Sequence, residues 1–446
     1  MEVTETAAAG LKREYRVVVP ATDLEAKVKE RLDDLKSRVQ IRGFRPGKVP
    51  VAHLKRLYGK SAMAEVIEAA VREANNKIVN DHGFKLATEP KVVLPSEEGA
   101  VEEVIAGQSD LAYTVEMEIV PPITLADFKT IELTRLTAPV TDEEVDRSVQ
   151  TLAEQNRPFV AKAEGAATGD RVTISFQGTM AGQPFDGGSG DDVPVVLGSG
   201  QFLPGFEDQL IGIKAGESRT FDIKFPEAYP APAIAGKAAT FAVTAKAVDA
   251  PGAVTVDDDF AKTLGLESLA KLRDAMRERI EREHAGASRQ KIKRALLDQL
   301  DARHKFEPPP TLAEEEFNNV WKSIEDDLKQ QNRTFADEGT TEEKARAEYR
   351  TIADRRVRLG LVLAEIGEKN NIKVTDEQLT QAIVAQARMV PGREQQVWDY
   401  YRNNPAAIAS LRAPIFEDKV VDFLLELAKV TDKQVSREEL FKEDED

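Results

Sequence analysis

Apolar residues in the first 120 positions follow two different spacings. In "LAYTVEMEIV" the residues Leu111, Tyr113, Val115, Met117 and Ile119 alternate with mainly polar neighbours, which predicts a half-buried strand. "EYRVVVP", residues 14–20, predicts a second short strand because it is rich in β-branched and aromatic residues. This part of the chain therefore contains a sheet.

Helical spacing fills the rest of this segment. Thr22 and Glu25 form the pattern of a capping box, which predicts a helix start. The expected apolar stripe of that helix is Leu24, Val28, Leu32, Leu35 and Val39. Pro50 predicts a short helix through Tyr58 that Gly59 stops, and a longer helix runs from Ser61 to about His82, where Gly83 ends it. The segment is α+β.

The pattern of apolar residues and glycines changes twice in the remaining chain. Residues 121–158 form a connector with a strand-like "TIELTRL" and a helix that Thr141 and Glu144 cap. Short alternating strands separated by glycine turns then predict a small antiparallel sheet over residues 159–250. Residues 251–446 read as long helices, one from Thr311 and another capped by Thr375 and Gln378. We expect an α+β, multidomain protein with segments 1–120, 121–158, 159–250 and 251–446.

Charge is distributed unevenly along the chain. There are 78 acidic against 61 basic residues, a formal net charge of −17. Residues 35–64 nevertheless contain no Asp or Glu, and they include the loop "QIRGFRPGKVP". A basic island in an acidic protein suggests a nucleic-acid or other polyanionic partner. The alternative is a solvated loop whose charges only aid solubility, and charge alone does not separate the two.

Several classes of function are disfavoured. No cysteine is present, and the four histidines, His53, His82, His284 and His304, lack ligand spacing, so we expect no metal site. "GGSG" and "GSG" match no phosphate-binding or nucleophile-elbow motif, so we expect no cofactor. The N-terminus lacks a signal-peptide pattern and no apolar run approaches about 18 residues, which predicts a cytoplasmic protein without a membrane partner.

One constellation of glycines and aromatics is specific. "GDRVTISFQGTMAGQPFDGG", "VPVVLGSGQFLPGFEDQLIGIKAGE" and "FPEAYPAPAIAGKAATFAV" follow one another between residues 169 and 243. In order and spacing they resemble the FKBP-type prolyl isomerases. The resemblance implies an antiparallel β-sheet with a short helix. The resemblance implies an apolar pocket with Asp186 at its edge, lined by Phe176, Phe185, Phe202, Leu203, Phe206, Tyr229 and Phe241. It departs from many single-domain members at Phe206, where they carry Trp, and at Phe176, where they carry Tyr.

That resemblance implies peptidyl-prolyl cis-trans isomerase activity without a cofactor. It assigns the Leu203 backbone N–H and the Tyr229 hydroxyl to substrate carbonyls, and Asp186 to a polar contact at the twisting amide. Without the motif, aromatics at strand spacing would be read as the core of a small barrel. The ordered motif reverses that preference.

The loop "GFRPGKVP" resembles the ribosome-docking signature of the trigger factor family of ribosome-associated chaperones. With the isomerase segment and the helical C-terminal part, this resemblance covers essentially the whole chain. It implies docking near the ribosomal exit tunnel, on protein and rRNA, through Phe44, Arg45 and Lys48. It also implies ATP-independent binding of nascent and unfolded polypeptides by the C-terminal helices, and it admits a homodimer when the chain is off the ribosome.

Two rival hypotheses belong to other classes. The chain could be a free cytoplasmic isomerase whose helices dimerise or recruit folded partners, which the basic island disfavours. It could also be an RNA-binding protein with a vestigial isomerase barrel, which the absence of a recognisable RNA-binding module disfavours. Ribosome co-sedimentation over a salt series would separate these hypotheses.

Overall fold

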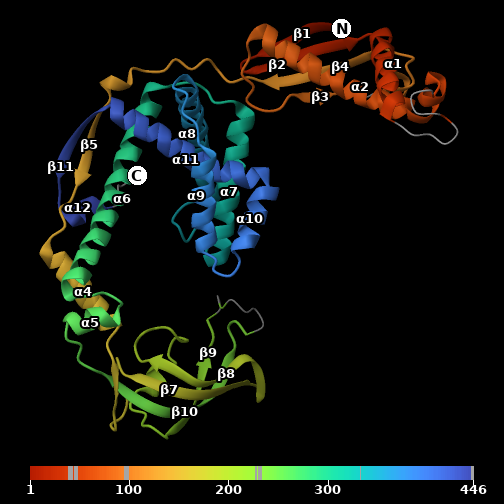
Figure 1. Cartoon of the computed structure of the whole chain (residues 1–446). Helices are drawn as coiled ribbons and strands as arrows, with labels where there is room; N and C mark the ends of the chain where they lie inside the picture. Colours follow the sequence, from red (N-terminus) through yellow and green to blue (C-terminus); the bar gives the residue numbers. More distant parts are fainter. Residues whose placement is uncertain are drawn as a thin grey trace. The chain divides into compact units, whose positions relative to one another are not determined.

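The computed structural model describes residues 1–38, 44, 49–94, 100–226, 229, 234–331 and 333–442 (Figure 1). The chain divides into two compact units. The first comprises Met1–Glu132, Ala295–Lys329 and Arg333–Lys429; the second comprises Leu133–Arg294, Gln330–Asn332 and Val430–Asp446. As expected, the architecture is α+β and multidomain.

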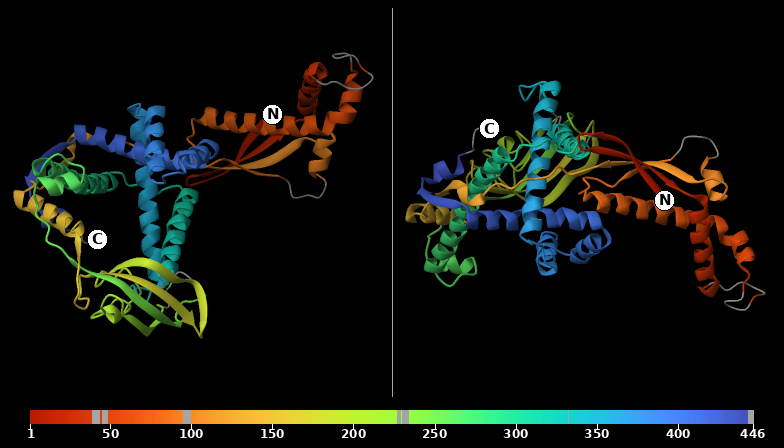
Figure 2. Two further views of the ribbon diagram at one scale, coloured as in Figure 1. Left: turned by 60° about the horizontal axis from the view of Figure 1, so that its bottom comes forward. Right: turned by 90° about the horizontal axis from the view of Figure 1, so that it is seen from above.

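The N-terminal part of the first unit is an antiparallel sheet with helices against it. The strand order is β1-β2-β4-β3. Its elements are β1 (Glu2–Ala9), β2 (Lys12–Val19), α1 (Ala21–Arg38), α2 (Val51–His82), β3 (Lys91–Val93), α3 (Ala100–Ile105) and β4 (Leu111–Glu118). The alternating residues of β4 are buried in one core with residues of α1 and α2, and α2 runs alongside the sheet in both views of Figure 2. Both predicted strands are confirmed.

Two helix boundaries in this part differ from the prediction. α1 begins at Ala21, so Thr22 lies inside the first turn and is not the N-cap. Asp110 Oδ1 accepts the Ala21 N–H at 2.8 Å, so a distant residue satisfies this end of the helix. Val39, expected at its far end, lies outside the described residues. The predicted stop at Gly59 is wrong, because α2 continues through it to His82. Leu54 before Gly59 and Met63 after it are buried in the same core, and this packing outweighs the cost of about 1 kcal/mol for a helical glycine. Gly83, with φ of 63°, ends α2 as predicted.

The first unit also contains a short 3-10 turn, η1 (Phe128–Thr130), and a helical part that begins at residue 295. Its helices are the last residues of α6 (Leu269–Arg303), then α7 (Pro310–Gln331), α8 (Glu342–Lys369), α9 (Asp376–Arg388), α10 (Glu394–Asn403) and α11 (Pro405–Leu427). α7 begins at Pro310, one residue before the predicted Thr311, because proline suits the first helical position. The capping box of Thr375 and Gln378 is confirmed.

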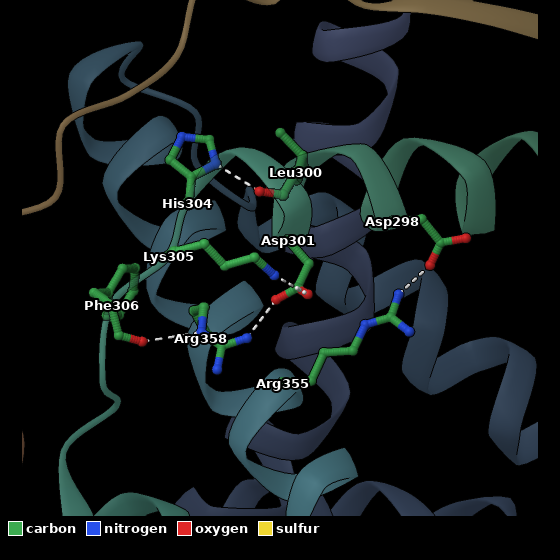
Figure 3. A network of polar contacts seen from close by, with 8 residues as sticks. All are labelled: Asp298, Leu300, Asp301, His304, Lys305, Phe306, Arg355 and Arg358. Atoms are coloured by element: carbon green, nitrogen blue, oxygen red, sulfur yellow. Dashed lines mark hydrogen bonds and ion pairs between the residues drawn. The ribbon is translucent and has the colours of Figure 1, made fainter.

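Packing and ion pairs hold these helices together. The Phe416 ring on α11 occupies the space that a Cβ at Gly367 on α8 would need, so the two helices approach closely there. Polar side chains join α6 to α8: Asp301 pairs with Arg358, and Asp298 with Arg355 (Figure 3).

The second unit contains the connector and the small sheet. The connector comprises β5 (Glu132–Thr137) and α4 (Asp142–Gln155), whose capping box of Thr141 and Glu144 is present as predicted. β11 (Lys429–Gln434), not predicted, pairs with β5, and the fork of Arg135 holds both carboxylate oxygens of Asp432 at 2.7 and 2.9 Å. The unit also includes α5 (Asp258–Thr263), the first part of α6 and α12 (Arg437–Phe441).

The sheet of the second unit has its own core. β6 (Phe159–Ala161), β10 (Ala238–Pro251), β7 (Arg171–Met180) and β8 (Gln183–Val196) pair in that order, and β9 (Ser218–Lys224) pairs with β10. All these pairs are antiparallel, as predicted. The short helix expected in this domain is a single 3-10 turn, η2 (Asp208–Leu210), between β8 and β9. Residues of these strands and of η2 bury one hydrophobic cluster, which supports the site.

Candidate active site

A cavity of about 500 Å³ opens on this sheet. All eight residues expected in the pocket line it: Phe176, Phe185, Asp186, Phe202, Leu203, Phe206, Tyr229 and Phe241. They come from β7, β8, β10 and the loops on either side of β9. Strands that are distant in sequence therefore bring together one aromatic-walled site.

Phe206 is the centre of the aromatic wall and is 2% exposed. The Phe202 ring stacks on it with centroids 5.3 Å apart and planes 22° apart, and Phe241 meets it edge-on at 5.4 Å. Phe185 in turn contacts Phe241 edge-on at 6.2 Å. Edge-to-face and offset pairs of this kind are favourable and fix the rings in place. The floor of the cavity is therefore rigid and apolar.

Two glycines make room for three of these rings. A Cβ at Gly178 would lie 2.7 Å from Phe241 and 2.9 Å from Phe185. A Cβ at Gly190 would lie 2.7 Å from Phe176. Gly178 in "FQG" and Gly190 in "FDGGSG" are thus required by the close approach of backbone to aromatic side chains, and they belong to the site as much as the rings do.

Polar groups lie at the rim. Asp186 is exposed and precedes Gly187, whose φ is 78°. Within the described part of the chain, the Leu203 N–H has no acceptor, while the Leu203 carbonyl accepts from Phe206 N–H at 2.9 Å. The Tyr229 ring meets Phe225 edge-on at 4.9 Å, so its position is set by the aromatic wall. One donor and one carboxylate thus remain available beside an apolar floor.

Six lining residues were not predicted: Gln201, Pro204, Phe225, Pro226, Ile234 and the backbone of Gly187. Phe225 could have been found, since the alternation in "RTFDIKFP" places Phe221, Ile223 and Phe225 on one face of β9 and just beyond it. Phe225 is buried, and its ring also contacts Phe185 edge-on at 5.9 Å. It extends the aromatic wall beside Phe185 and Phe241.

The predicted docking loop lies between α1 and α2, more than a hundred positions before the cavity residues in the sequence. Phe44 is described and is 38% exposed, with its ring centroid 5.3 Å from that of His53. Val49, near the end of the loop, is buried in the N-terminal core. Arg45 and Lys48 lie outside the described residues. An exposed aromatic ring on this loop is consistent with a contact surface.

No group of side chains in the described ranges could hold a metal ion. Of the four histidines, His284 and His304 are buried and contact backbone oxygens through Nδ1, of Ala138 at 3.0 Å and of Leu300 at 2.7 Å. Of the helices described, none combines the length and the apolar character that crossing a bilayer requires.

Comparison with protein-family models matches the chain in three stretches. Residues 1–152 match the model described as bacterial trigger factor protein, and residues 268–426 match the trigger factor C-terminus. Residues 162–246 match the FKBP-type peptidyl-prolyl cis-trans isomerase model. The chain is 64% identical over 446 residues to the trigger factor of Azorhizobium caulinodans, covering 100% of this chain and 99% of the relative.

The chain belongs to the trigger factor family. A trigger factor of Xanthobacter autotrophicus is 60% identical over 447 residues, with 100% of this chain and 99% of the relative covered. A solved structure that concerns promiscuous substrate recognition by the trigger factor chaperone shares the fold, with a TM-score of 0.55 and 20% identity over 96% of this chain and 99% of that one. The predicted family and function, a ribosome-associated chaperone of nascent polypeptides with an FKBP-type isomerase domain, are confirmed.

Proposed function

We propose that the aromatic cavity is where this trigger factor isomerises X-Pro bonds. The observation that carries the proposal is the convergence of Phe176, Phe185, Phe202, Phe206 and Phe241 on one cavity, with Asp186, Leu203 and Tyr229 around it. A proline ring is a compact apolar group, and an apolar pocket with few polar groups at its rim is the ordinary form of a small-ligand site.

The chemistry follows from that arrangement. An X-Pro bond isomerises over a barrier of about 18–20 kcal/mol because amide resonance is lost as the bond twists. A water-poor pocket that favours the twisted amide over the planar one lowers this barrier without an acid, a base or a metal. In the proposed role, the Leu203 N–H and the Tyr229 hydroxyl hold substrate carbonyls, and Asp186 makes a polar contact with the twisting amide.

For attachment to the ribosome, we propose the loop that carries Phe44, Arg45 and Lys48. The ribosome surface near the exit tunnel presents RNA phosphates and protein. Arginine and lysine supply a salt-dependent attraction to phosphates, and an exposed aromatic ring adds short-range contact. The exposed Phe44 ring supports this proposal. We place this activity in the cytoplasm.

Unfolded polypeptides require a different surface, and we propose the turn between α9 and α10, together with Tyr400 on α10, as part of it. Met389 is 77% exposed, Tyr400 56% and Val390 42%. Exposed apolar side chains among charged ones suit weak binding of many sequences. We further propose the division of the chain into segments 1–120, 121–158, 159–250 and 251–446, and a homodimer for the chain away from the ribosome.

Measuring cis/trans exchange of a short Phe-Pro peptide with the full-length chain tests the isomerase site. Phe202→Ala should lower kcat/KM by about tenfold, because a contact worth about 1.4 kcal/mol in the transition state is removed. Val160→Ala, at an exposed position on β6 of the same domain, is the matched control and should leave the rate unchanged. A folded Phe202→Ala variant with the parent's rate would show that the reaction occurs elsewhere.

A further inference from the structure

The loop of residues 198–203 carries three lining residues of the cavity, Gln201, Phe202 and Leu203. It belongs to no helix or strand, and Gly198 and Gly200 have φ of 86° and 68°. Glycines of this kind give a loop many alternative conformations, so its geometry must be imposed by other groups. The question is which group holds Phe202 and Leu203 in position.

The carboxylate of Glu207 accepts four hydrogen bonds from this loop. Oε2 accepts the Gly198 N–H at 2.7 Å and the Gly200 N–H at 3.1 Å. Oε1 accepts the Phe202 N–H and the Ser199 hydroxyl, both at 3.2 Å. Each oxygen thus binds two donors, and together they hold alternate backbone amides of the loop around one anion.

Glu207 is buried, at 7% exposure, between Phe206 and the 3-10 turn η2. Burial raises the pKa of its carboxyl, but the backbone N–H groups of Gly200, Phe202 and Gly198 outweigh this, so the net pKa lies below the usual range. Within the described residues no cation forms an ion pair with Glu207. Its charge is stabilised by the loop itself, and the loop is ordered in return by that charge.

We propose that Glu207 is a positioning residue for prolyl isomerisation. By fixing the Phe202 N–H it holds the Phe202 ring stacked on Phe206, and it turns the next amide, Leu203 N–H, away from the protein's own acceptors. Glu207 lies behind the cavity wall and is not among the lining residues. The inference rests on the proposed function of the cavity, and it names the group that preorganises it.

Substitution by glutamine separates charge from shape. Glu207→Gln keeps the size of the side chain, but its NH₂ group would face two of the four donors, so it can accept only half of the present hydrogen bonds. Glu217→Gln is the matched control, since Glu217 Oε2 accepts one backbone N–H, from Lys214 at 2.9 Å, in an exposed turn of the same domain.

The test measures kcat and KM of the full-length chain on a Phe-Pro peptide, well below the unfolding temperature. Glu207→Gln should lower kcat/KM by about tenfold, Glu207→Asp should recover part of the loss, and Glu217→Gln should match the parent. A role in stability alone would leave the rate of folded molecules unchanged. If Phe202→Ala loses activity while folded Glu207→Gln keeps it, the positioning role is wrong; if both keep it, the cavity assignment itself is wrong.

A measurement on the parent chain keeps the inference testable if the variants do not fold. The amide resonances of Gly198, Gly200 and Phe202 should shift together as the Glu207 carboxylate is protonated at acidic pH. The kcat/KM value should fall over the same pH interval, because the loop is released. Amide resonances that shift with pH while kcat/KM stays constant would overturn the proposal.

Discussion

Arg358 on α8 donates through Nη1 to Asp301 on α6 at 2.5 Å, and both side chains are only 17% exposed (Figure 3). Arg358 Nε also donates to the Phe306 carbonyl at 3.0 Å, so one guanidinium fixes the end of α6 and the chain that follows it. A second cation, Lys305, contacts the same carboxylate at 3.1 Å but is 66% exposed. This arrangement predicts that the two cations on the Asp301 carboxylate contribute unequally to the free energy of unfolding.

Arg358→Met should lower the free energy of unfolding of the helical part by about 2 kcal/mol, because a charged hydrogen bond is lost and Asp301 stays largely buried. Lys305→Met is the matched control and should cost less than about 0.5 kcal/mol, since exposed ion pairs contribute little. Denaturant titration followed by circular dichroism measures both. Equal losses for the two variants would contradict the assignment of this helix contact to Arg358.

The same pair gives a pH dependence. Burial raises the pKa of Asp301, but the hydrogen bonds from Arg358 and Lys305 outweigh it and leave the pKa below its usual range. Its stabilising contribution is therefore complete above the pKa of an unfolded aspartate, about 3.9, and is lost as the pH falls through the lower, folded-state pKa. In Arg358→Met this acid-induced loss should be smaller than in the parent.

The turn between α9 and α10, together with Tyr400 on α10, should bind unfolded chains. Replacing Met389 and Tyr400 together by Ser should weaken the ability of the full-length chain to delay aggregation of a denatured protein, because both exposed apolar contacts are removed. Stability should change by less than about 0.5 kcal/mol, the usual range for exposed positions. Ile211→Ser, an exposed apolar residue of the isomerase domain, is the control. Unchanged protection by the double variant would place client binding on another surface.

Client binding should also survive removal of the isomerase domain. The Gly252 N–H donates to the Pro158 carbonyl at 2.8 Å, so the two ends of residues 159–251 are adjacent and a short glycine linker can replace them. The shortened chain should still delay aggregation of a denatured protein, with or without ATP, since no phosphate-binding motif occurs in the sequence. Complete loss of protection in a folded, shortened chain would move client binding onto the isomerase domain.

Periodicity and capping patterns predicted the strands β2 and β4, the helix α4 and the antiparallel sheet of the second unit, because these depend on local chemistry. β11 was missed because "KVTDKQ" is polar and exposed, and only its pairing with the distant β5 makes it a strand. Gly59 was misread because packing on both sides of a glycine does not appear in a local pattern.

Some residues of the candidate site could be predicted from the sequence and others could not. The aromatic residues of the cavity were found through an ordered motif, and the structure brings them together; their roles in catalysis stay predictions. Glu207 was missed because an acidic residue in "GFED" is expected at the surface. Its burial follows only from the path of the 198–203 loop around it, which no spacing in the sequence specifies.

Co-sedimentation with ribosomes over a salt series tests the attachment of this chain to the ribosome most directly. Arg45→Ala with Lys48→Ala should weaken binding and flatten its salt dependence by about one in slope for each cation that neutralises a phosphate. Phe44→Ala should weaken binding with the slope nearly unchanged, and both variants should keep the parent's isomerase rate. Replacing all three by Ala should abolish co-sedimentation; a triple variant that still sediments with ribosomes like the parent would contradict docking through this loop.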